Sequence, residues 1–134
     1  MVGASAYDHL KESTQVIPID AGAGAKTANG VPYTDRTGEL TFANVRAQMW
    51  WTLREDLDPA NGELIALPDD KDLLAQLTAP KWKPTKQGIL IESKDDIKKR
   101  LHRSIDDADA VVMSNINTAK AKKAKTIKFE GWGQ

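Results

Sequence analysis

The chain has 134 residues, of which 40% are hydrophobic and only 6% aromatic, enough for one domain with a thin core. It has no cysteine, which excludes disulfides and zinc–thiolate sites and agrees with a reducing compartment. No stretch approaches the roughly 18 apolar residues of a membrane span, and the N-terminus lacks the basic and apolar segments of a secretory signal.

The net charge is zero, but the charge is unevenly distributed along the chain. Residues 1–93 contain nine Lys and Arg against thirteen Asp and Glu, whereas residues 94–134 contain ten against six. A basic C-terminal third is compatible with an anionic polymer as partner. The alternative is a solvated basic tail that binds nothing.

The first third of the chain carries weak signals. We predict a short helix over residues 2–12, a short strand over 15–19, and a loop over 20–38 with a small hairpin around 31–34. The loop contains A-G-A-G-A-K, which lacks the G-x-x-x-x-G-K-[ST] spacing of a phosphate loop and is therefore rejected as one.

Residues 42–56 give the strongest helix pattern. Thr41 can cap this helix, and its apolar stripe consists of Phe42, Val45, Met49 and Leu53. Trp50 and Trp51 widen the stripe; they could stack on DNA bases or belong to the core. Arg46 and Arg54 lie four residues before and four residues after Trp50, so either guanidinium can contact the indole.

Shorter elements follow. A helix is predicted over 70–77, and two strands over 81–85 and 88–92 are joined by a turn. Ser93, with an acid three residues later, predicts the start of a lysine-rich helix over 94–101.

The last predicted helix opens with S-I-D-D-A-D-A-V-V at residues 104–112. Ser104 and Asp107 resemble a capping box. Asp109 falls at the edge of the stripe Ile105, Ala108, Val112 and Ile116, where a carboxylate is costly unless it is paired or binds a cation. Asp106, at i−3, points the same way. The pair either holds Mg²⁺ or Mn²⁺ or is a solvated acidic helix start.

The order of three segments resembles a known family. They read F-A-N-V-R-A-Q-M-W-W-T-L-R-E-D-L (42–57), E-L-I-A-L-P-D-D-K-D-L-L-A-Q-L (63–77) and G-I-L-I-E-S-K-D-D-I-K-K-R-L-H-R-S-I-D-D-A-D-A-V-V (88–112). Together with the opening V-G-A-S-A-Y-D-H-L, this order resembles the C-terminal nuclease domain of the large terminase subunit of tailed bacteriophages.

The resemblance implies an α/β, ribonuclease H-like nuclease that cuts concatemeric viral DNA with two divalent metal ions. In such domains three acids hold the metals, one on the first strand, one on a later central strand and one on the last helix in an Ala-Asp-Ala context. By this likeness Asp109 is the third acid, and Asp106 resembles the auxiliary acid of related Holliday-junction resolvases.

The resemblance also predicts what this sequence lacks. The chain starts after the position of the family's first two acids, so we expect residues 1–117 to be a partial nuclease domain without the first strands of its central sheet, followed by a basic, flexible tail at 118–134. Such a chain should bind Mg²⁺ or Mn²⁺ weakly and should be inactive alone. It should also expose the apolar stripe of its last helix and so favour association.

The implied partners are double-stranded DNA, the missing N-terminal nuclease and ATPase part, and possible contacts with the portal protein and the small terminase subunit, in the cytoplasm of a bacterial host. The residues expected along the DNA backbone are Lys94, Lys98, Lys99, Arg100 and Arg103. Lys94 could reach a phosphate or a metal-bound carboxylate, or be a surface lysine. The alternatives to a nuclease segment are a non-catalytic DNA-binding or motor-assembly module and a truncated prophage remnant.

Overall fold

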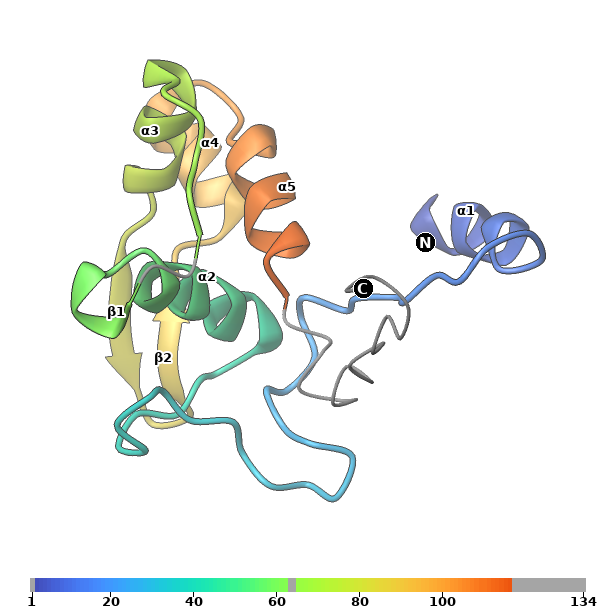
Figure 1. The fold of residues 1–134 in the computed structure, drawn as a ribbon, viewed down its shortest axis with the longest axis horizontal. Helices are drawn as coiled ribbons and strands as arrows, with labels where there is room; N and C mark the ends of the chain where they lie inside the picture. The colour runs from blue at the N-terminus through green and yellow to red at the C-terminus, as the bar shows by residue number, and fades with distance from the viewer. Residues whose placement is uncertain (1, 63–64, 117–134) are drawn as a thin grey trace, which may run out of the picture.

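The computed structural model describes residues 2–62 and 65–116 as a small mixed α/β protein (Figure 1). Its elements in chain order are α1 (Val2–Leu10), α2 (Val45–Asp56), a 3₁₀ turn (Pro59–Asn61), α3 (Lys71–Thr78), β1 (Trp82–Thr85), β2 (Gly88–Ile91), α4 (Lys94–Leu101) and α5 (Asp106–Ser114). The predicted tail at 118–134 lies outside the described residues.

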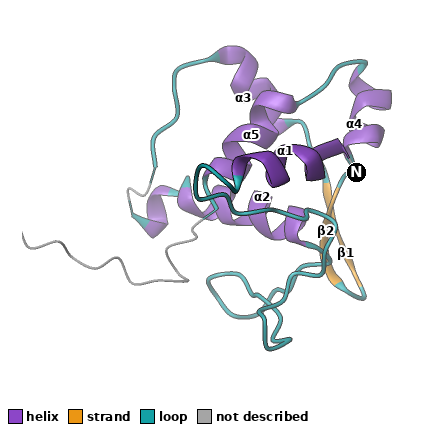
Figure 2. Ribbon diagram, turned by 90° about the vertical axis from the view of Figure 1, so that its right-hand side faces the viewer, coloured by secondary structure: helices purple, strands orange, loops and turns teal. Residues whose placement is uncertain are grey.

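The helix α2 is the centre of the arrangement. It packs on β2 on one side and on α5 on the other, and α5 also packs on α3 (Figure 1). The largest fully buried side chains are Leu53, Ile97, Ile105 and Val112, so one core joins α2, α4 and α5. The connection between α1 and α2 is drawn almost entirely as loop (Figure 2).

The two strands form an antiparallel hairpin in which Trp82 is opposite Ile91 and Thr85 is opposite Gly88. The segment before α2 pairs with the other edge of β2: the Ile89 amide donates to the Thr41 carbonyl at 2.8 Å, and the Ala43 amide donates to the Ile89 carbonyl at 2.9 Å. This close pairing explains Gly88, whose φ is +115° and where a Cβ would lie 2.5 Å from the Thr41 oxygen.

Several predicted elements are confirmed. The helix α4 has the predicted bounds, with the Ser93 hydroxyl accepting from the Asp96 amide at 3.1 Å. The hairpin and α3 lie within one or two residues of the predictions, and Asp70 caps α3. Trp50 and Trp51 are buried, in agreement with the core interpretation of these side chains.

Other predictions are wrong, and a tertiary contact explains one of them. Residues 15–19 form no strand. The helix α2 begins at Val45 and is capped by Asn44 rather than by Thr41, because residues 41–43 pair with β2. The capping box at Ser104 and Asp107 does not form; the N-cap residue of α5 is Ile105.

The apolar stripe of α5 is not exposed, contrary to expectation. Ile105, Ala108 and Val112 are at most 1% exposed, and Ile116 is partly buried against the same core. The helices α2 and α3 cover the apolar face of α5, which we expected to pack on a larger sheet. No helix of the described residues has the length and apolar character needed to cross a membrane.

Candidate functional site: a buried carboxylate between two cations

Asp109 is a buried acid in the first half of α5. Only 5% of the residue is exposed, because its neighbours Ala108 and Val112 belong to the buried stripe and bring this side of the helix against the core. A carboxylate in such a place must be compensated by a cation or by hydrogen bonds. Its surroundings therefore decide what it can do.

Two cations from different helices meet this carboxylate. Arg46 of α2 donates from Nη1 to Oδ1 of Asp109 at 2.6 Å. Lys94, at the first position of α4, places its Nζ 3.1 Å from Oδ2 of Asp109 and 2.8 Å from Oδ1 of Asp106. The i,i+3 acid pair predicted from the sequence does converge, and Lys94 is the cation on which it converges.

The four charged side chains of the cluster differ in their exposure to solvent. The side chains of Asp109 and Arg46 are 6% and 13% exposed, whereas those of Lys94 and Asp106 are 51% and 72% exposed. The hydrogen bond from Lys94 lowers the pKa of Asp106 below its ordinary value, and the same bond raises the pKa of Lys94. The outer ion pair is therefore fully charged at neutral pH.

Several buried polar atoms of the cluster have no hydrogen-bond partner among the described residues. They are Nε and Nη2 of Arg46, Nε1 of Trp50 and Oδ2 of Asp109. The Oδ2 atom lies within ion-pair distance of Lys94 but receives no well-directed hydrogen bond. The Arg46 guanidinium also lies over the Trp50 ring, 5.6 Å from its centroid, as expected from the sequence. The cluster thus keeps buried donors of Arg46 and Trp50 without a partner among the described residues, whereas Oδ2 of Asp109 is paired with the Lys94 ammonium.

The acid pair offers oxygen ligands of the kind Mg²⁺ and Mn²⁺ prefer. However, the cation position between the two carboxylates is filled by the Lys94 ammonium. Within residues 2–62 and 65–116, no group of three or more His, Cys, Asp or Glu side chains could hold a metal. As they stand, these residues do not fit a two-metal centre by themselves.

The start of α5 is held by a residue that the sequence did not suggest. Gln76 of α3 is 4% exposed, and its Oε1 accepts from the backbone amides of Asp107 and Ala108 at 3.1 and 3.2 Å. Its Nε2 donates to Oδ2 of Asp107 at 2.9 Å. Gln76 therefore caps α5 from another helix and fixes the turn that presents the acids. The sequence contains one sign of this role: Gln76 lies between Leu73 and Leu77, in the apolar stripe of α3.

The predicted DNA-binding residues fall into two groups. Lys94 is engaged by the acids, Arg103 pairs with Asp72 at 2.7 Å, and Arg100 makes two bonds to Glu92 at 2.9 and 2.6 Å. These two bonds lower the pKa of Glu92 to about 2. The remaining two, Lys98 and Lys99, are exposed on α4, and Lys99 has Asp96 only at 4.0 Å.

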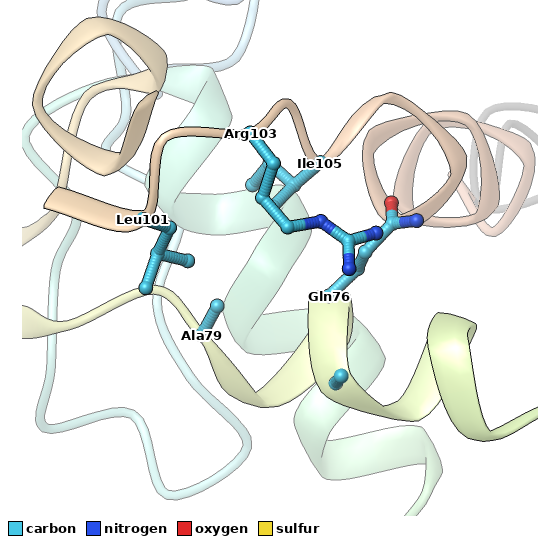
Figure 3. A pocket seen from close by; sticks show the side chains of 6 residues that line it. Gln76, Ala79, Leu101, Arg103 and Ile105 are labelled. Atoms are coloured by element: carbon cyan, nitrogen blue, oxygen red, sulfur yellow. The ribbon is translucent and has the colours of Figure 1, made fainter. Parts of the chain in front are cut away.

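A pocket of about 300 Å³ lies elsewhere in the described residues (Figure 3). It is lined by Ala75, Gln76, Ala79, Leu101, Arg103 and Ile105. These walls are mostly apolar and include neither Asp109 nor Lys94, so the pocket is not part of the acid cluster.

Comparison with known proteins gives little. No family model and no solved structure matches the chain. The chain is 28% identical over 136 residues to sulfate adenylyltransferase subunit 1 of Shewanella oneidensis, a match that covers 98% of this chain and 27% of that protein. The chain thus spans about a quarter of the length of this curated relative, and the likeness does not establish a family.

Proposed function

We propose that the chain is the C-terminal segment of a terminase-type, metal-dependent DNA nuclease of ribonuclease H-like fold, to which it supplies Asp109, with Asp106 as an auxiliary acid. The other acids of the centre come from residues outside the segments that resemble the family. In this proposal the substrate is double-stranded concatemeric phage DNA, cut during packaging in the cytoplasm of the bacterial host.

One observation carries the proposal. The three segments that resemble the family are separate in the sequence, yet each contributes a side chain at the start of α5. The first segment supplies Arg46, the second supplies Gln76, and the third supplies Lys94, Asp106 and Asp109. Arg46 and Lys94 contact the buried Asp109 itself, and Gln76 fixes the turn just before it. This convergence of the three segments on one turn of α5 supports the proposal.

The chain alone is expected to lack cutting activity. Two-metal hydrolysis requires several carboxylates that hold two cations about 3.5–4 Å apart, to stabilise both the attacking and the leaving oxygen. Asp106 and Asp109 can supply only part of such a set. The active nuclease would be formed with a partner segment, namely the N-terminal nuclease and ATPase part of the terminase.

The contact with DNA is assigned to the exposed lysines of α4. Lys98 and Lys99 should give sequence-independent, salt-sensitive binding through phosphate contacts. Changing both to Gln should weaken binding of a duplex and reduce the slope of log K against log salt by about 2. The control changes Lys83 and Lys86 of the hairpin, both exposed, to Gln. Equal losses in the two double variants would remove α4 from the DNA path.

The experiment that tests the proposal is plasmid cutting with Mn²⁺. Three proteins are compared: the chain alone, the chain fused to the first acidic strands of a complete terminase nuclease domain, and the same fusion with Asp109→Ala. We expect cutting only by the unchanged fusion. A folded fusion that cuts equally well without the Asp109 carboxylate would contradict the proposal, as would cutting by the chain alone at a rate unaffected by Asp109→Ala.

A further inference from the structure

An exposed indole lies on the outer strand of the hairpin. Trp82 of β1 is 54% exposed, whereas Trp50 and Trp51, for which the sequence left base stacking open, are both buried. The Trp82 ring meets the buried Trp51 ring edge to face, and the two centroids are 5.2 Å apart. Because such a contact has a preferred geometry, Trp82 presents a positioned aromatic ring to the solvent.

The cations near this ring are not neutralised by neighbouring acids. Residues 80–91 read P-K-W-K-P-T-K-Q-G-I-L-I and contain three lysines but no Asp or Glu. Arg54 of α2 lies over the other side of the aromatic pair, 4.8 Å from the centroid of the Trp51 ring. Lys83, Lys86 and Arg54 are exposed and form no salt bridge with an acid in the described part of the chain. The surface around the hairpin is therefore positively charged.

The outer edge of β1 is a poor place for a further β-strand. Among the described residues β1 pairs only with β2, so this edge is open (Figure 1). Pro84 within β1 has no amide to donate, and Lys83 beside it discourages the approach of a second backbone. These two residues explain how the edge avoids pairing, but they do not explain the exposed indole. A flat ring with negative charge beside it is the ligand chemistry that fits Trp82 and its cations together.

We propose that the hairpin binds a single-stranded nucleic acid, whose bases stack on Trp82 and whose phosphates pair with Lys83, Lys86 and Arg54. Stacking of this kind tolerates any sequence, because every base has a flat face. A duplex keeps its bases stacked inside and does not offer one to Trp82. The inference goes beyond the proposed function, since it depends neither on the acids of α5 nor on the duplex contact assigned to α4.

The test is titration of the full chain into fluorescein-labelled oligothymidylate or oligouridylate of about 16 nucleotides, followed by fluorescence anisotropy; the tighter complex identifies the strand as DNA or RNA. Trp82→Ala should weaken binding about tenfold, whereas Trp82→Phe, which keeps a ring, should lose less. The matched control Tyr33→Ala removes an exposed aromatic ring outside the hairpin and should change the affinity little. Changing Lys83 and Lys86 to Gln should reduce the slope of log K against log salt by about 1.4.

Two further readouts separate stacking from a general loss of binding. The oligonucleotide should quench the tryptophan fluorescence of the unchanged chain, and Trp82→Phe should lose this quenching while it still binds. The affinity for a duplex of the same length should be the same in Trp82→Ala, whose fold is checked by circular dichroism. Absence of single-strand binding by the unchanged chain overturns the proposal, as does an unchanged affinity in folded Trp82→Ala or an equal loss for duplex and single strand. None of these measurements involves DNA cutting, so this proposal and the nuclease proposal can fail separately.

Discussion

Removing the Asp109 carboxylate should destabilise the fold far more than removing its neighbour Asp106. Asp109→Ala leaves the Arg46 guanidinium, whose side chain is 13% exposed, without the partner that accepts its 2.6 Å bond. An uncompensated buried charge of this kind costs about 3–5 kcal/mol, a large part of the roughly 5–15 kcal/mol that holds a domain folded. Asp109→Asn keeps an acceptor for Arg46 and should cost less.

Urea denaturation followed by tryptophan fluorescence measures these differences, since Trp50 and Trp51 are both buried. The matched control is Asp106→Ala, which removes a carboxylate from the same helix where the side chain is 72% exposed, and should change stability little.

A double variant separates loss of charge compensation from a general packing defect. If the cost of Asp109→Ala comes from an unpaired Arg46, then Arg46→Met combined with Asp109→Ala should recover part of the lost stability. Equal costs for Asp109→Ala and Asp106→Ala would refute the reasoning. So would a double variant whose cost is the full sum of the two single ones.

Three further predictions concern the support of the site and the fold. Gln76→Ala removes the acceptor of two amides at the start of α5 and should cost about 1–3 kcal/mol, measured by the same denaturation; a loss within experimental error would show that another group caps this turn. Gly88→Ala places a Cβ 2.5 Å from the Thr41 oxygen at a φ of +115°, and should lower the melting temperature by the equivalent of about 2 kcal/mol or more; an unchanged melting temperature would contradict the close pairing beside β2. The pKa of Glu92 is lowered from 4.5 to about 2 by its bonds to Arg100, so the stability from this pair is fully present above about pH 4.5 and is lost as the pH falls toward 2; Glu92→Gln should flatten the decline of stability in this window, and an unchanged decline would show that the pair contributes nothing.

Sequence reasoning succeeded where structure depends on neighbours in the chain. Ser93 and the acid three residues later fix the start of α4, and the turn before Gly88 fixes the hairpin. It failed where distant residues compete for the same segment. Phe42 has a helical period with α2, but the backbone of 41–43 pairs with Ile89, which lies 47 positions later, and the helix therefore begins at Val45.

The candidate site, too, could be predicted from the sequence only in part. The i,i+3 spacing of Asp106 and Asp109 showed that the two acids share a side, and the pattern around them showed that Asp109 needs a partner. The partner's identity could not follow from local pattern, because Arg46 is 63 residues away and is brought to Asp109 only by the packing of α2 on α5.

The measurement that tests the central claim most directly is a crystal structure of the active fusion with Mn²⁺, in which anomalous scattering locates the metal. The account predicts an Mn²⁺ ion coordinated by the Asp109 carboxylate. A manganese centre that does not include Asp109 would contradict it.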